Sequence, residues 1–216
     1  MNDLRNAMKL YAVTDRAWTG RQTLYEQIEA ALRGGITCLQ LREKNLDEDS
    51  IIKEAMEIKE LCRSYNVPLI INDSPHIAVK AGADGVHIGQ KDMSLSDARE
   101  ITGPGMIIGV TAATPELAVK AEKEGADYIG SGAVFGSTTK NDARPLSHDV
   151  LRKICSSVSI PVAAIGGINR DNMLQLSGTG ISGVALVSAV FAAENIEAEC
   201  RLLKELSGRI VSGGNI

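Results

Sequence analysis

In one short segment, residues 39–45, which reads LQLREKN, an amide and two cationic side chains stand at every second position. In an extended chain alternate residues share a face, so Gln40, Arg42 and Lys44 point one way, and Leu41 and Glu43 point the other. A face that carries two cations requires an anionic partner. Taken alone, however, the segment favours an edge strand with one solvated face.

Two aspartates follow later strand candidates: Asp73 comes after IIN, and Asp92 comes after HIGQK. Two carboxylates on neighbouring loops, without a histidine or thiolate cluster, suit a hard cation such as Mg²⁺. Taken alone, they favour helix N-caps, because Asp73 precedes SPHIAVKAG and Asp92 precedes MSLSDARE. With Arg42 and Lys44 on the adjacent strand end, a metal-bound diphosphate becomes the better explanation, because Mg²⁺ usually binds through carboxylates plus substrate phosphates.

A second anion site is predicted further along the chain. Residues 136–140, GSTTK, offer backbone N–H groups, hydroxyls and a cation, while GGIN begins at Gly166 and VSA begins at Val187. In a (β/α)8 barrel the loops after the last two strands often bind phosphate. The alternative is a tight turn at Gly166 and Gly167 with Ser188 packed internally. The convergence of three elements favours a monophosphate site.

The sequence contains no Ser/His/Asp or Cys/His set for covalent catalysis. The histidines form no paired metal-ligand spacing and are predicted to be structural, and the cysteines form no CxxC motif and are predicted to be buried, reduced thiols. A reaction that needs mainly positioning and neutralisation of a leaving diphosphate fits these residues. The histidines are His76, His87 and His148, and the cysteines are Cys38, Cys62, Cys155 and Cys200.

The elements that position these residues repeat along the chain. In four segments, a glycine follows a helix-like run and two residues later an apolar strand begins, which predicts a helix C-cap glycine leading into a strand. The segments are GITCLQLRE, GADGVHIGQ, GADYIGSGA and GISGVALVS. Four further apolar runs, KLYAVTD, VPLIIND, MIIGVTA and IPVAAIGG, bring the number of predicted strands to eight.

Helical patterns fall between these strands, with apolar residues three and four apart over residues 24–33, 47–64, 115–124 and 148–157. Strand and helix in alternation predict a parallel sheet covered by helices. For 216 residues we expect a single (β/α)8 barrel domain over residues 1–216. Seven strand ends carry polar residues or glycine, and in a barrel these ends share one rim, which predicts a pocket there.

The bulk composition excludes several classes of protein. The chain is 44% hydrophobic and 23% charged, as expected for a globular protein with a full core. The net charge of -4 argues against a general nucleic-acid binder. The start, MNDLRNAMKLYAVTD, lacks a signal-peptide core, and the apolar run at 181–193 is too short to span a bilayer. We therefore expect a cytoplasmic protein without nucleic-acid or membrane partners. Whether it forms a homo-oligomer stays open.

With these motifs in order, the chain resembles the thiamine phosphate synthase (thiamine-phosphate pyrophosphorylase) family over about residues 10–193. The most specific matches are QLREK, IIND, HIGQKD, TTKND and AIGGIN. The resemblance implies a transferase that joins 4-amino-5-hydroxymethyl-2-methylpyrimidine diphosphate to a thiazole phosphate and releases pyrophosphate. It also implies a dissociative reaction in which diphosphate leaves with help from Mg²⁺ before the thiazole nitrogen attacks.

The resemblance further implies roles for individual residues. Asp73 and Asp92 would hold Mg²⁺, and Thr111 would contact the pyrimidine. Arg42, Lys44 and Lys140 would be catalytic through charge stabilisation of the diphosphate. The pyrimidine diphosphate would be bound by Gln40, Leu41, Arg42, Glu43, Lys44 and Asn72, and the thiazole phosphate by Ser137, Thr138, Thr139, Gly167, Val187 and Ser188.

Three positions depart from the family pattern: Thr111 replaces a common serine, Ser137 a threonine, and Ala113 a histidine. Thr111 and Ser137 keep a hydroxyl, but Ala113 cannot replace a histidine contact. Glu43 has an alternative as the partner of a nearby Lys or Arg outside the pocket. Two other functions stay open: a thiazole tautomerase-like isomerase, and a non-catalytic sensor of a phosphorylated ligand.

Overall fold

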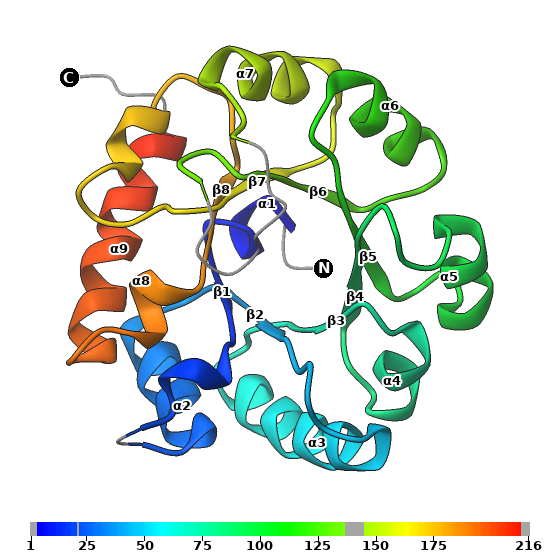
Figure 1. Cartoon of the computed structure of the whole chain (residues 1–216), viewed down its shortest axis with the longest axis vertical. Helices are drawn as coiled ribbons and strands as arrows, with labels where there is room; N and C mark the ends of the chain where they lie inside the picture. Colours follow the sequence, from blue (N-terminus) through cyan, green and yellow to red (C-terminus); the bar gives the residue numbers. More distant parts are fainter. Residues whose placement is uncertain (1–3, 21, 137–144, 213–216) are drawn as a thin grey trace.

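The protein is a closed barrel of eight parallel strands in the order β1 to β8, with β8 paired to β1 (Figure 1). The computed structural model describes residues 4–20, 22–136 and 145–212. The strands are β1 (Leu10–Val13), β2 (Cys38–Leu41), β3 (Leu69–Asn72), β4 (Gly85–Ile88), β5 (Ile107–Thr111), β6 (Tyr128–Gly132), β7 (Val162–Ile165) and β8 (Gly183–Leu186). Each predicted strand is therefore present, and the predicted (β/α)8 fold is confirmed.

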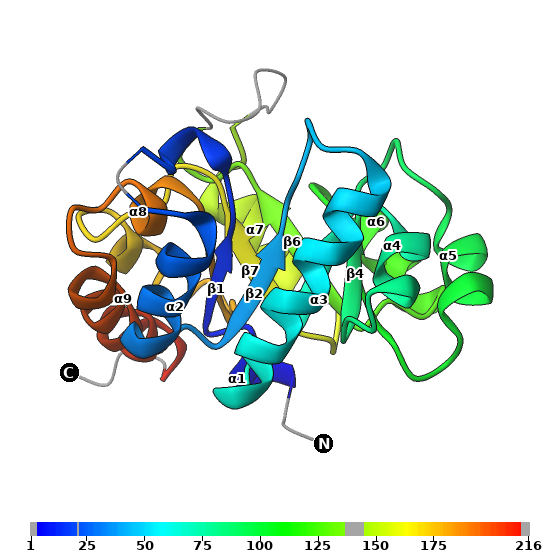
Figure 2. The same ribbon diagram turned by 90° about the horizontal axis from the view of Figure 1, so that it is seen from below.

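Helices surround the barrel (Figure 1). They are α2 (Leu24–Gly34), α3 (Glu48–Ser64), α4 (Pro75–Lys80), α5 (Leu95–Thr102), α6 (Pro115–Lys123), α7 (His148–Ser157), α8 (Ser188–Phe191) and α9 (Ile196–Val211). Two 3-10 helices, η1 (Arg16–Trp18) and η2 (Met173–Leu176), follow β1 and β7. Helix α1 (Leu4–Ala7) precedes β1 and lies below the barrel, opposite the β2–α3 loop (Figure 2).

Local sequence signals account for where helices begin. Thr23 forms a capping box with Glu26 at the start of α2, and Asp47 accepts the Ser50 N–H at the start of α3. The N-caps of α4 and α5 are Ser74 and Ser94. Asp73 and Asp92 are therefore not N-caps, so the capping alternative is wrong.

The predicted glycines between helix and strand adopt the left-handed conformation that favours this residue. The φ angles are 91° at Gly35, 63° at Gly82, 96° at Gly125 and 87° at Gly180. The first three follow α2, α4 and α6 closely. Gly180 differs, because the helix before it is the short 3-10 helix η2, which ends four residues earlier at Leu176.

The strands separate two apolar layers. Leu39 and Leu41 belong to the larger layer between the strands and the helices, whereas Tyr11, Cys38 and Tyr128 belong to the smaller layer inside the barrel. Because β2 pairs with both β1 and β3, it has no free edge, and the interpretation as a solvated edge strand is wrong. Among the described helices, none is both long and apolar enough to cross a membrane.

Candidate functional site

Parallel strands bring their carboxyl ends to one rim of the barrel, and the β2–α3 loop rises from that rim (Figure 2). Strand β2 ends at Leu41, so Arg42 and Lys44 stand just above the barrel. A pocket of about 360 Å³ lies here, lined by residues 15–17 and 42–45. The predicted cations therefore border a pocket at the expected end of the molecule.

The Lys44 ammonium lies 2.7 Å from a carboxylate oxygen of Asp73, at the end of β3. Both side chains are accessible, with exposed fractions of 50% and 36%. Asp73 has a φ of 66°, which an aspartate tolerates better than most residues but which still costs energy. The structure therefore brings together the two kinds of charge that the sequence analysis assigned to a metal-bound diphosphate.

Asp92 completes this charged group from the loop after β4. One of its carboxylate oxygens accepts the Gly89 N–H at 2.7 Å. Burial raises the pKa of Asp92, and the neighbouring Asp73 carboxylate raises it further, while the Gly89 N–H lowers it. Two carboxylates held this close repel each other, and a cation between them would relieve that repulsion.

The donor set fits a hard divalent ion that completes its coordination with substrate oxygens and water. Asp73 and Asp92 supply carboxylate oxygens only. In the part of the chain that the structure describes, there is no group of three or more His, Cys, Asp or Glu residues that could hold a metal ion. A small metal carried in with a diphosphate matches this arrangement better than a structural zinc.

A chain of buried and partly buried polar groups crosses the barrel beneath the rim. The Gln40 amide donates to the Tyr11 hydroxyl at 2.6 Å, and that hydroxyl lies 2.8 Å from the Tyr128 hydroxyl. His87 joins Tyr128 to Thr111, with 2.9 Å to each hydroxyl. Two predicted pyrimidine contacts, Gln40 and Thr111, are thus linked through three side chains.

The two phenol groups of this hydrogen-bonded network are neutral, because burial raises the pKa of both Tyr11 and Tyr128 well above the ordinary value. Glycine creates the necessary space. A Cβ at Gly109 would lie 2.0 Å from the Tyr128 ring, and one at Gly130 would lie 2.9 Å from the His87 ring. The two phenols can therefore orient neighbouring polar groups without introducing a phenolate charge beneath the rim.

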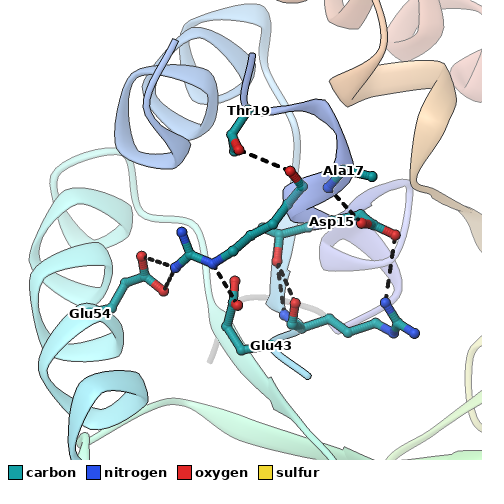
Figure 3. Close-up of polar contacts among 8 residues, drawn as sticks. Asp15, Ala17, Thr19, Glu43 and Glu54 are labelled. Carbon is teal, nitrogen blue, oxygen red and sulfur yellow. Dashed lines mark hydrogen bonds and ion pairs between the residues drawn. The ribbon is translucent and has the colours of Figure 1, made fainter. Parts of the chain in front are cut away.

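The side chain of Glu43 points away from the cations on either side of it. It accepts from the Arg16 Nε at 2.7 Å and is only 2% exposed. Arg16 also contacts Glu54 on α3 (Figure 3). The alternative in which Glu43 pairs with a nearby cation is therefore found, with Arg16 as that cation, but both residues border the pocket and do not lie outside it.

The predicted monophosphate site is described in part. Gly167 has a φ of 64°, and a Cβ there would lie 2.6 Å from the Phe135 carbonyl oxygen, so the GG motif packs against the loop after β6. Val187 and Ser188 lie where β8 passes into the short helix α8. The remaining predicted residues of this site, Ser137, Thr138, Thr139 and Lys140, lie outside the described residues.

The other predicted polar residues fall where expected along the strands. Asn72 ends β3 and pairs in register with His87, and Thr111 ends β5 opposite Gly130. The four cysteines are free thiols. Burial raises the pKa of Cys62, Cys155 and Cys200 to about 12, so none of these thiols is an ionised nucleophile at neutral pH.

Sequence reasoning missed Thr14, Asp15 and Arg16, which follow β1; Asp15 and Arg16 border the same pocket. Thr14 contacts the backbone of Arg42, and Asp15 lies 3.6 Å from its guanidinium. A signal was present, because the first strand candidate, KLYAVTD, ends in two polar residues and Arg16 follows it, as polar residues follow other strands.

Fold and site together define a (β/α)8-barrel protein whose open end is lined with cations beside a pair of carboxylates. Such an end suits a phosphorylated ligand accompanied by a metal. The model of the thiamine monophosphate synthase family matches residues 10–190. This chain belongs to that family.

Individual relatives agree with the family model. The chain is 47% identical to the thiamine-phosphate synthase of Ruminiclostridium cellulolyticum, over 91% of this chain and 94% of the relative. It is 45% identical to thiamine-phosphate synthase 2 of Streptococcus pneumoniae, with coverages of 94% and 97%. The solved thiamine phosphate pyrophosphorylase from Pyrococcus furiosus superposes with a TM-score of 0.89 at 39% identity, covering 97% of this chain and all of that one.

Proposed function

We propose that this single-domain protein is a thiamine-phosphate synthase. It joins 4-amino-5-hydroxymethyl-2-methylpyrimidine diphosphate to a thiazole phosphate, carboxylated or not, and releases pyrophosphate. The observation that carries the proposal is the Lys44–Asp73–Asp92 group beside Arg42, on a chain 47% identical to a relative of that name. We also propose that it acts on small molecules in the cytoplasm.

The protein contributes mainly electrostatics and positioning. Arg42 and Lys44 would bind the diphosphate and stabilise the charge that develops as it leaves, with Lys140 assigned to the same role from the family resemblance. Asp73 and Asp92 would hold Mg²⁺. When bound, that ion would neutralise the diphosphate and make it a better leaving group.

Recognition of the pyrimidine would come from the upper end of the buried polar chain. Gln40 is held by Tyr11, and Thr111 is held by His87, so neither side chain needs to be ordered when the ring binds. Asn72 ends β3, the strand next to β2, and would contact the same substrate. For the thiazole phosphate, Gly167, Val187 and Ser188 are proposed together with Ser137, Thr138 and Thr139.

The proposed mechanism requires no protein nucleophile. Once the diphosphate has left, the aminopyrimidine delocalises the positive charge, and the thiazole nitrogen attacks. The raised thiol pKa values are compatible with this route, because they leave the cysteines protonated. The residues at the rim would then hold the two substrates in line and exclude competing water.

The purified protein, incubated with both substrates and Mg²⁺, tests the proposal by chromatographic detection of thiamine phosphate. Omission of either substrate should abolish the product. A chain that instead interconverts thiazole phosphate isomers without the pyrimidine would be a tautomerase-like isomerase. One that binds a phosphorylated ligand without Mg²⁺ and forms no product would be a sensor.

A further inference from the structure

Three consecutive residues after β1, the 14–16 segment, contact the end of β2. The Thr14 hydroxyl accepts the Arg42 N–H at 2.9 Å, and the Asp15 carboxylate lies 3.6 Å from the Arg42 guanidinium. Arg16 donates from Nε to Glu43 at 2.7 Å. Figure 3 shows these contacts running side by side between the two chain segments. The 14–16 segment therefore holds both the backbone and the side chains of the segment that carries the cations.

Arg16 joins a third element to these two. Its terminal nitrogen donates to both carboxylate oxygens of Glu54 on α3, at 2.5 and 2.6 Å (Figure 3). The guanidinium thus binds Glu43 through Nε and Glu54 through one terminal nitrogen, because arginine carries several N–H donors. The end of β2 is thereby fixed to both the preceding loop and the following helix.

Glu43 depends strongly on this contact. Its side chain is 2% exposed, and its second carboxylate oxygen has no hydrogen-bond partner among the described residues. Without Arg16, a buried carboxylate would lose its ion pair, which favours its movement toward water. Because Arg42 and Lys44 flank Glu43 in the chain, such a movement would redirect both cations.

We propose that Arg16 is a positioning residue for the reaction: it holds Glu43 against α3 and so fixes the direction in which Arg42 and Lys44 meet the diphosphate. This inference rests on the proposed function for the identity of the ligand. Glu43 then acts through its backbone neighbours and does not contact the substrate with its carboxylate. Arg16 is not among the site residues predicted from the sequence.

Arg16→Gln, Glu43→Gln and the double variant test the proposal. The matched control is Arg33→Gln, because Arg33 also bridges two glutamates, Glu29 and Glu197, at 3.1 Å each. That bridge joins α2 to α9 on the outside of the barrel. For each variant, steady-state kinetics give kcat/KM for the pyrimidine diphosphate and KM for the thiazole phosphate, and thermal unfolding reports the fold.

Each single variant should lower kcat/KM for the pyrimidine diphosphate by about tenfold or more, while the KM for the thiazole phosphate changes less than about twofold. The double variant should be no worse than the more severe single variant, because both substitutions break one contact. Arg16→Lys keeps a cation beside Glu43 and should recover part of the loss. Arg33→Gln should leave both kinetic parameters unchanged.

Multiplicative defects in the double variant would overturn the proposal, because the two residues would then act separately. Unchanged kinetics, or equal losses for both substrates with a lowered unfolding temperature, would overturn it as well. Calorimetry with Mg²⁺ and inorganic pyrophosphate separates this inference from the proposed reaction. If the wild type makes no product but Arg16→Gln weakens pyrophosphate binding, the reaction assignment fails and the positioning role stands.

Discussion

The Lys44 ammonium and the Asp73 carboxylate lie 2.7 Å apart, across the ends of two adjacent strands. One side chain is proposed to bind a diphosphate and the other a cation, so the two proposed binding roles belong to groups of opposite charge that lie in contact. A metal-bound diphosphate would give each side chain a new partner of opposite charge. The pair therefore marks the point on the rim where the metal and the diphosphate would meet.

Lys44→Ala separates the catalytic role of this pair from any structural role. Exposed ion pairs contribute about 0–1 kcal/mol, so the free energy of unfolding should change by no more than about 1 kcal/mol. Turnover should fall about 100-fold or more, because a group that stabilises developing charge is lost. Urea unfolding and steady-state kinetics measure the two effects; near-normal turnover would remove Lys44 from the proposed role.

Asp92→Asn should weaken the response to Mg²⁺ and stabilise the protein at neutral pH. Burial raises the pKa of Asp92 above its ordinary value, so the ionised carboxyl costs more in the folded state than in the unfolded state. That cost develops as pH rises through the folded-state pKa. Without Mg²⁺, the variant should therefore unfold at a higher temperature than the wild type at pH 7, and the gain should shrink as pH falls toward 3.8.

A magnesium titration of activity gives the functional half of that prediction. The variant should need more Mg²⁺ for half-maximal rate, because one carboxylate ligand is lost. Asp97→Asn offers a control on α5, since Asp97 contacts the N-cap Ser94 and lies away from the pair. An unchanged magnesium dependence in Asp92→Asn would contradict the metal assignment.

Gly109→Ala should destabilise the barrel by about 3 kcal/mol or more. The added Cβ would lie 2.0 Å from the Tyr128 ring, and the ring is fully buried, so the barrel interior must move. Gly208→Ala is a matched substitution on α9, where no atom lies within 4 Å of the new Cβ. It should stabilise by up to about 1 kcal/mol. Equal effects of the two substitutions in urea unfolding would refute the packing argument.

Glu122 should contribute to stability at neutral pH but not in acid. Its carboxylate accepts from the Ser159 hydroxyl and N–H and from the Ile160 N–H, and these bonds lower its pKa. A lowered pKa means stability that is complete above the ordinary value of 4.5 and is lost as pH falls through the folded-state value. Glu122→Gln should cost about 1 kcal/mol at pH 7 and nothing at strongly acidic pH. A cost that persists in acid would disagree with this linkage.

Short-range patterns in the sequence were sufficient to predict the barrel. Apolar β-branched runs predicted the eight strands, and the glycine before β2, β4 and β6 follows a helix as expected. The capping residues were harder to predict. Asp73 and Asp92 have the right chemistry for N-caps, but a serine stands nearer to each helix start and takes the cap. Propensity alone does not decide between two good candidates one or two residues apart.

Contacts between distant residues could not be predicted in the same way. Arg16 and Glu43 are 27 residues apart, and Tyr11 and Tyr128 are 117 apart, so no local spacing connects either pair. Hydrophobicity also does not distinguish the two faces of a barrel strand, because both faces are buried. Residues 14–16 nevertheless carry a local signal, because they are polar and directly follow the first strand.

The most direct test of the central claim is the stoichiometry of a single reaction mixture. Both substrates are added to the wild-type protein, with and without Mg²⁺, and thiamine phosphate and pyrophosphate are quantified together. A thiamine-phosphate synthase with the proposed mechanism should form equal amounts of the two products, and only when Mg²⁺ is present. Binding of the thiazole phosphate with neither product formed would contradict it, and so would pyrophosphate release without thiamine phosphate.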